Sequence, residues 1–171
     1  MTMNIPVFVS CPTTLTSAQN AARQVILREL GKLGLEARAL GRTDYPVDLP
    51  LGEVAVIAKH CSGGVILGFE QFHTDRGIWK RGSKEPRPQK GDAVFPSPWN
   101  HLEAGILYGL RLPLLVFRED GIRGGVFDDG VTDAFVHLMP KSNLSAAKRA
   151  ALTSVFLKWQ GRVRDHYYRD E

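Results

Sequence analysis

The sequence predicts a doubly wound α/β fold: a five-stranded, mostly parallel sheet with helices on both faces. Short apolar runs without charge alternate with longer amphipathic segments along the chain. Such alternation implies parallel strands that are joined by crossover helices. The composition is that of a globular protein, with 43% hydrophobic and 23% charged residues. Because a chain of 171 residues suits one domain far better than two, we expect a single domain over residues 1–171.

The chain begins with an apolar strand and an amphipathic helix. Residues 5–9 are apolar and too few for a helix, and the run ends at Ser10. Thr16 or Ser17 can cap a helix that continues to about residue 30, because small and apolar side chains recur on one of its faces. The glycines that follow favour its termination.

A second strand, a second helix and a third strand come next. Residues 35–40 alternate apolar and charged side chains, and residues 41–46 are rich in turn formers. Asp48 with Pro50 favours a helix start, and apolar residues recur behind it at helical spacing. Residues 65–69 carry no charge, as expected of a strand that is covered on both faces.

Regular patterning stops between Gln71 and Pro98. This segment holds four prolines and several glycines, and its residues repeat with neither a helical nor a strand period. A long loop inside a compact domain is usually a lid, a binding loop or disordered. We therefore expect a structureless basic loop over about 71–98. A lid and a solvated surface segment are about equally favoured as interpretations of this loop. Its basic residues are Arg76, Lys80, Arg81, Lys84, Arg87 and Lys90.

Periodic patterning returns after this loop. A helix over 99–109 is expected to begin at Ser97 and Pro98, and apolar strands are expected over 112–117 and 134–138. Between these strands lies a Gly-rich polar loop. It lacks the Lys-Ser/Thr ending of a phosphate-binding P-loop, so a plain loop is the favoured interpretation. A final helix, capped by Ser142 or Asn143, carries apolar residues on one face.

Several classes of protein and partner are not expected. Cys11 and Cys61 stand alone, and the five histidines form no ligand-spaced cluster, so we predict buried thiols, no metal site and a reducing cytoplasm. No leader is evident at Met1, and no window is long and apolar enough to suggest a membrane partner. Nucleic acid is not expected either, because the net charge of +4 is modest and the basic loop offers only Trp79 for base stacking.

Ligands of an open parallel sheet bind beyond the carboxyl ends of its strands. Ser10, the loop after residue 40 and Glu70 all follow strands, and the helix at Trp99 starts at the same edge. The carboxylate of Glu70 could bind a ribose hydroxyl there. A carboxylate that merely faces water is the slightly favoured alternative.

Trp99 and Glu103 provide the sharpest functional signal. Residues four apart share one face of a helix. A carboxylate beside an indole is partly desolvated, which raises its pKa and suits a reaction that builds positive charge on a sugar ring. The alternative from spacing alone is a core aromatic and a solvated acid. Two features favour the site: Ala104 and Gly105 allow close approach of another backbone, and the helix opens from the basic loop.

These residues resemble a known family. Ser97, Trp99 and Glu103, followed by a Pro-led apolar strand, look like the Trp-x-x-x-Glu helix of Toll/interleukin-receptor (TIR) domains. The stretches 103–106 and 112–116 are also similar to nucleoside 2-deoxyribosyltransferases, which share a flavodoxin-like architecture and use a glutamate at the matching place. The opening strand matches both groups. The long basic insertion is not typical of their short members.

The resemblance implies a site and a reaction. Glu103 would be the catalytic glutamate with Trp99 beside it, Ser10 would line the floor, and Arg42 and Asp44 would form the gate. Enzymatic TIR domains cleave the nicotinamide–ribose bond of NAD as a substrate, without a further cofactor, and bacterial ones often serve in anti-phage defence. The transferases instead move a deoxyribose between bases. A non-catalytic nucleotide sensor, or an assembly module that binds itself or a partner effector, is the remaining alternative.

Overall fold

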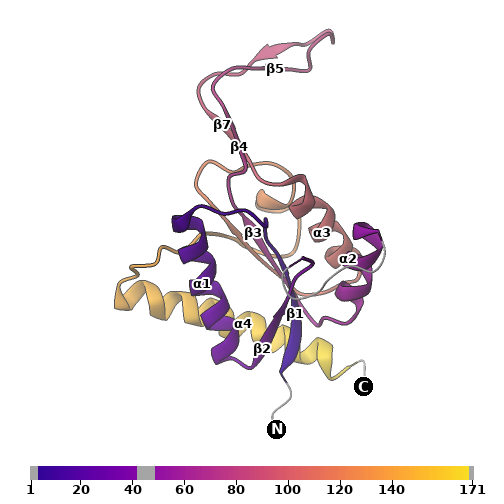
Figure 1. Ribbon diagram of the computed structural model, residues 1–171, viewed down its shortest axis with the longest axis vertical. Coiled ribbons are helices and arrows are strands. Elements are labelled where there is room, and N and C mark those ends of the chain that lie inside the picture. Colours follow the sequence, from indigo (N-terminus) through magenta and orange to yellow (C-terminus); the bar gives the residue numbers. More distant parts are fainter. Residues whose placement is uncertain (1–3, 42–48, 170–171) are drawn as a thin grey trace.

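The computed structural model of the protein describes residues 4–41 and 49–169. Its centre is a five-stranded sheet in the order β2-β1-β3-β8-β9 (Figure 1). The doubly wound prediction is confirmed, and all four strand pairs are parallel, so the sheet is parallel throughout. The strands are β1 (Ile5–Ser10), β2 (Leu35–Arg38), β3 (Gly64–Gly68), β8 (Leu114–Arg118) and β9 (Val136–Leu138).

Helices cover both faces of this sheet. The helices are α1 (Ser17–Lys32), α2 (Pro50–Lys59), α3 (Pro98–Gly109) and α4 (Ala146–Tyr167). Val7 and Val9 point into the core on the side of α1 and α4, whereas Phe8 points into the core on the side of α2 and α3. This alternation follows from the two-residue period of a strand, and it explains why a central strand is apolar at every position.

Side-chain caps place the starts of three helices. Thr16 forms a capping box with Gln19 at the start of α1, as the sequence predicts for one of its two candidates. Ser97 caps α3 and Pro98 occupies its first turn. The expected cap of the last helix is wrong: Ser145, rather than Ser142 or Asn143, accepts the backbone N–H of Lys148 at 3.3 Å. All three residues are good caps, so their composition could not separate them.

Some strand ends also differ from the expected ones. The second strand stops at Arg38, where its ladder with β1 ends at Phe8↔Arg38, and an isolated bridge follows at Leu40. The fourth strand starts two residues late, since the carbonyl of Pro113 accepts bonds from Gly64 and from the indole of Trp159. Sequence periodicity does not register such changes of partner.

The expected structureless loop is instead an arm, which we define as residues 71–97 (Figure 1). Two antiparallel ladders build it: β4 (Phe72–Thr74) with β7 (Ala93–Phe95), and β5 (Ile78–Trp79) with β6 (Arg87–Pro88). The arm leaves the sheet at the end of β3 and returns at α3. The strands are too short to leave a period in the sequence, which is why the prediction failed here.

Gly68 permits a close approach at the carboxyl end of β3. A Cβ at Gly68 would collide with the ring of Phe127, which lies in a short 3₁₀ helix, η1 (Gly125–Phe127).

Of the two cysteines, Cys61 is buried as expected, whereas Cys11 is only half-buried. Within residues 4–41 and 49–169, no helix is long and apolar enough to cross a bilayer.

Candidate active site

A pocket of about 350 Å³ lies at the carboxyl end of β1. Four segments meet around it: the β1–α1 loop, the ends of the segment between β2 and α2, the base of the arm and the first half of α3. The chain winds from β1 to β2 on one side and to β3 on the other, so the pocket lies at the switch point of the sheet. Its lining residues are Cys11, Pro12, Thr13, Thr14, Leu40, Gly41, Pro50, Gln71, Ser97, Trp99, Asn100 and Glu103.

Glu103 enters this pocket from the first half of α3. Burial raises its pKa from the ordinary value of 4.5 to about 7, and a hydrogen bond with the Ser10 side chain opposes the rise. A carboxyl in this range exchanges its proton near neutral pH, which suits it to act as an acid, a base or an ionised nucleophile. It is the only carboxyl among the described residues that line the pocket.

Ser10 lies beneath Glu103 and has no exposed surface. Its Oγ accepts a hydrogen bond of 2.8 Å from Nδ2 of Asn100, which also lies 3.4 Å from the carbonyl of Leu67. Because Ser10 Oγ is already an acceptor, its own hydrogen is free to be donated to the carboxylate of Glu103. The three side chains form a polar chain that runs from the core to the pocket.

Asn100 is a site residue that the sequence reasoning missed. It is 1% exposed, it lines the pocket, and no hydrogen-bond partner is present for its buried Oδ1. Its position could have indicated a role in the site, because residues three apart, such as Asn100 and Glu103, lie on one side of a helix. A buried amide with an unsatisfied acceptor is costly in a fold, so such a group is a marker of functional sites.

Trp99 lines the pocket with its indole 43% exposed. The alternative of a core aromatic beside a solvated acid is therefore wrong, because it is the aromatic that is exposed and the acid that is desolvated. The placement follows from Ser97 and Pro98, which start the helix immediately before Trp99 and so leave its side chain at the helix end. An exposed indole at a pocket wall offers a flat face for stacking.

Glu70 follows β3 as expected, but its side chain is exposed and does not line the pocket. Its backbone is bound instead: Glu119 Oε2 accepts the N–H of Glu70 at 2.6 Å, and Gln19 Nε2 donates to the carbonyl of Glu70 at 3.2 Å. Gln19 also donates to Glu119 at 3.0 Å. Glu119, which the sequence reasoning did not single out, therefore connects the ends of β3 and β8 with the start of α1.

The two expected gate residues, Arg42 and Asp44, lie outside the described residues. Leu40, Gly41 and Pro50, which flank that segment, line the pocket. The ends of the segment are therefore at the site where the resemblance implied a gate.

The Gly-rich loop after β8 is anchored to the fold by the buried residues Ile122, Val126 and Phe127. His101 of α3 lies edge-on to Phe127 at 5.4 Å, and a Cβ at Gly125 would approach its ring at 2.7 Å. Burial lowers the pKa of His101, so its imidazole is a neutral packing group at pH 7. The backbone N–H of Gly124 donates to Asp128 at 2.9 Å.

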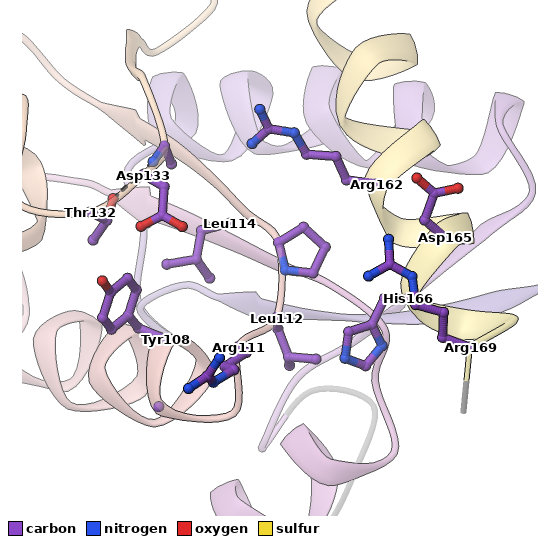
Figure 2. A pocket seen from close by; sticks show the side chains of 13 residues that line it. Tyr108, Arg111, Leu112, Leu114, Thr132, Asp133, Arg162, Asp165, His166 and Arg169 are labelled. Carbon is purple, nitrogen blue, oxygen red and sulfur yellow. Dashed lines mark hydrogen bonds between the residues drawn. The ribbon is translucent and has the colours of Figure 1, made fainter.

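A larger pocket of about 780 Å³ lies at the opposite edge of the sheet, near the start of β8 (Figure 2). Its charged side chains project from exposed positions on Arg111, Asp133, Arg162, Asp165 and Arg169. Cations and carboxylates are mixed there, and parallel sheets place their ligand sites at the other edge. The pocket beside Glu103 is therefore the stronger candidate site.

No family model matches this chain, and neither a curated protein nor a solved structure is significantly similar to it. The resemblance to TIR domains and deoxyribosyltransferases accordingly stays a prediction. Among the residues that the structure describes, no three His, Cys, Asp or Glu side chains are grouped to hold a metal ion. The described pocket lining offers the carboxyl of Glu103, the indole of Trp99, and hydroxyl, amide and thiol groups.

Proposed function

We propose that this protein cleaves the nicotinamide–ribose bond of NAD, with Glu103 as the catalytic carboxylate. The observation that carries the proposal is the desolvation of Glu103, whose pKa is raised to about 7 in a pocket at the switch point of the sheet. The pocket volume of about 350 Å³ falls within the range of small-molecule sites. The base and ribose are the part of the substrate that it must enclose.

The reaction that best matches this carboxylate builds positive charge next to it. When an N-glycosidic bond breaks, the ribose approaches an oxocarbenium ion. A carboxylate in a poorly solvated wall attracts such a cation more strongly than one in water would. Ser10 donates to the ionised form of Glu103 and so holds the carboxylate in place as the charge develops.

The carboxyl content of the described pocket lining favours a substrate whose leaving group is already cationic. Glu103 is the only carboxyl among the described lining residues, so none of the others is a carboxylic acid that could protonate a departing purine or pyrimidine. Nicotinamide needs no proton, because the pyridinium nitrogen takes the electron pair of the broken bond and leaves neutral. Water then adds to the ribose carbon and releases one proton, which yields ADP-ribose.

A pyridinium substrate would also activate its own catalyst. A cation bound near Glu103 favours the ionised carboxylate and lowers its pKa from about 7. The exposed indole of Trp99 can stack on the same ring, and a cation over an indole face gains about 0.5–2 kcal/mol. Both effects select a positively charged base over a neutral one.

The test is incubation of the protein with NAD at high protein concentration, with release of nicotinamide followed by mass spectrometry. We expect Glu103→Gln to lower the rate at least 100-fold, since loss of one electrostatic contact to the transition state has effects of about this size. Glu36→Gln is the matched control, because it removes an exposed carboxylate on β2 that does not line the pocket. Equal rates for Glu103→Gln and the parent protein would contradict the proposal.

The same experiment separates the other functions that the resemblance implies. Deoxynucleosides are included together with free bases, and exchange of the base without any cleavage of NAD would assign the transferase reaction instead. Thermal stabilisation by nucleotides without turnover would indicate a sensor or an assembly module. A role in anti-phage defence, and a dependence on self-assembly, stay predictions from the resemblance.

A further inference from the structure

The arm concentrates the positive charge of the whole molecule. Residues 76–90 contain six Lys or Arg and one Glu, a net charge of +5, whereas the complete chain carries +4. The complete arm, residues 71–97, also holds Asp75 and Asp92 and so carries +3, which leaves +1 for the rest of the chain. All six cationic residues of the arm are exposed.

The arm is a preorganised ribbon. The ring of Trp79 lies 5.8 Å from that of Phe95, which lies 6.2 Å from that of Phe72. These contacts link the outer ladder to the inner one. The indole N–H of Trp79 donates to Gln89 at 2.5 Å, and the backbone N–H of Gln89 donates to the carbonyl of Gly77 at 2.8 Å.

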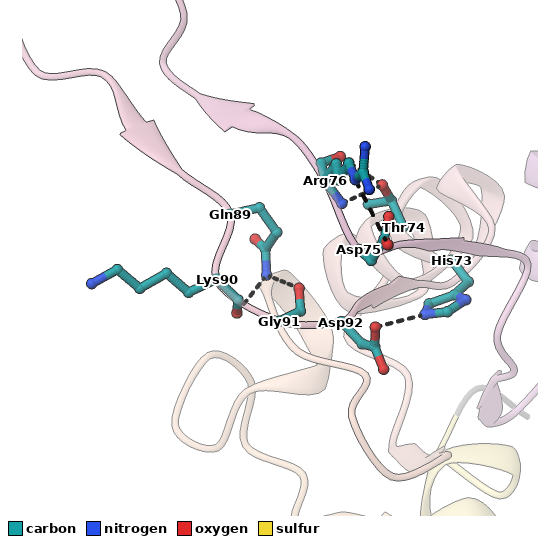
Figure 3. Close-up of polar contacts among 8 residues, drawn as sticks. All are labelled: His73, Thr74, Asp75, Arg76, Gln89, Lys90, Gly91 and Asp92. Carbon is teal, nitrogen blue, oxygen red and sulfur yellow. Dashed lines mark hydrogen bonds and ion pairs between the residues drawn. The ribbon is translucent and has the colours of Figure 1, made fainter.

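Polar contacts continue along the inner part of the arm (Figure 3). His73 Nε2 lies 3.3 Å from Asp92, and the side-chain amide of Gln89 donates to two carbonyls, those of Lys90 and Gly91. A ribbon that is ordered before it meets a partner loses little conformational entropy on binding. The backbone positions that carry its cations are therefore held in place.

The cations face more than one direction. Arg87 is the one cation in the outer ladder, where it pairs with Trp79. Figure 3 shows the side chains of Arg76 and Lys90 leaving the two strands of the arm in different directions. Two of the six cations contact a carboxylate: Lys80 lies 3.4 Å from Glu85, and Arg76 lies 4.0 Å from Asp75. Within the described part of the chain, no carboxylate forms an ion pair with the remaining four cations: Arg81, Lys84, Arg87 and Lys90.

We propose that the arm docks in the major groove of double-stranded DNA through contacts to the phosphates. That groove is about 12 Å wide and admits a two-stranded β-ribbon. Phosphates line both of its walls, so exposed cations that leave the two strands of a ribbon in different directions can find partners on both walls. A flat anionic surface, such as a membrane, would meet only one face or the tip.

Groove docking differs from base stacking, the mode of nucleic-acid binding against which the sequence argued. A stacking platform for single strands needs several exposed aromatic rings. Phe72 and Trp79 are 60% and 47% exposed and each contacts the ring of Phe95, so the single-strand comparison below decides between stacking and groove docking. Insertion into a groove needs a narrow ribbon and cations, and the arm has both. The contacts named above are to the DNA backbone, so binding without sequence preference is expected.

The test uses the complete chain and a fluorescein-labelled 20-base-pair duplex, with anisotropy measured between 50 and 200 mM salt. If four to six cations contact phosphates, log K falls against log[salt] with a slope of about −3.6 to −5.4. Affinity then drops by about 150-fold to 1,800-fold over this range. Substitution of Arg81, Lys84, Arg87 and Lys90 by Gln should reduce the slope to no steeper than about −1.8 and weaken binding at 50 mM salt more than tenfold.

A matched variant controls for the change in net charge. Substitution of four exposed cations of α4 by Gln (Lys148, Arg149, Lys158 and Arg162) removes the same charge far along the chain. Equal losses of DNA affinity in the two variants would overturn the proposal. So would equal affinity for a 20-nucleotide single strand, or arm-dependent binding to phosphatidylserine vesicles without binding to the duplex. Glu103→Gln should bind DNA as the parent does, which separates this test from that of the proposed enzyme.

Discussion

Replacement of Glu103 by Gln should make the fold more stable, and more so as the pH rises. In the folded protein burial raises the pKa of this carboxyl from 4.5 to about 7. The corresponding difference in free energy is about 3.4 kcal/mol, since one pKa unit corresponds to about 1.36 kcal/mol. Gln has nearly the shape of a protonated Glu and cannot ionise. The variant therefore removes the free-energy penalty that the buried carboxylate carries at a pH where it would be ionised in the unfolded chain.

The sign follows from proton binding in the two states. A folded-state pKa above the unfolded-state value means that Glu103 favours folding most below pH 4.5, and that this contribution is lost as the pH rises through about 7. About 0.8 kcal/mol is already lost at pH 5, so about 2.6 kcal/mol more is lost between pH 5 and pH 8.5. For a chain of this size, that corresponds to about 5–10 °C in melting temperature.

The measurement compares melting temperatures of Glu103→Gln and the parent protein at pH 5 and pH 8.5. Other titrating groups are common to both proteins, so the difference between the two proteins isolates Glu103. The advantage of the variant should grow by about 5–10 °C towards the higher pH. The reasoning would be refuted by a difference that is the same at both pH values, because Glu103 would then titrate alike in the folded and unfolded states.

Two further predictions concern the neighbours of the site. Ser10→Ala removes the hydrogen bond that opposes the rise in the pKa of Glu103, so this pKa should rise above about 7. In the pH profile for nicotinamide release, the limb along which activity increases with pH should then move to higher pH. An unchanged limb would contradict the hydrogen bond between Ser10 and Glu103. Gly68→Ala places a Cβ against the ring of Phe127 and should lower the free energy of unfolding by about 1–3 kcal/mol in urea titrations. Gly105→Ala is its control and should be neutral or slightly stabilising, because a Cβ at Gly105 would meet open space. The close approach of another backbone that the sequence suggested at Gly105 is thus wrong.

Much of the architecture could be predicted from local patterns. The apolar runs at β1 and β3 and the amphipathic pattern of α1 depend only on residues that are close in the chain. They can therefore be recognised from the sequence without the fold. The helix that carries Trp99 and Glu103 was predictable for the same reason, because Ser97 and Pro98 mark its start. The arm was not, since its strands are two or three residues long and depend on cross-strand pairing and ring contacts.

The site divides along the same line. The sequence determined two features of the site. The four-residue spacing places Trp99 and Glu103 on one helix face, and the order of elements starts this helix at the ligand edge of a parallel sheet. The tertiary structure alone decided that the indole is exposed while the carboxyl is desolvated. It also joined Asn100 to Ser10, 90 positions apart in the chain. A pKa depends on which groups exclude water from a side chain, and here those groups come from segments that meet only when the sheet is assembled.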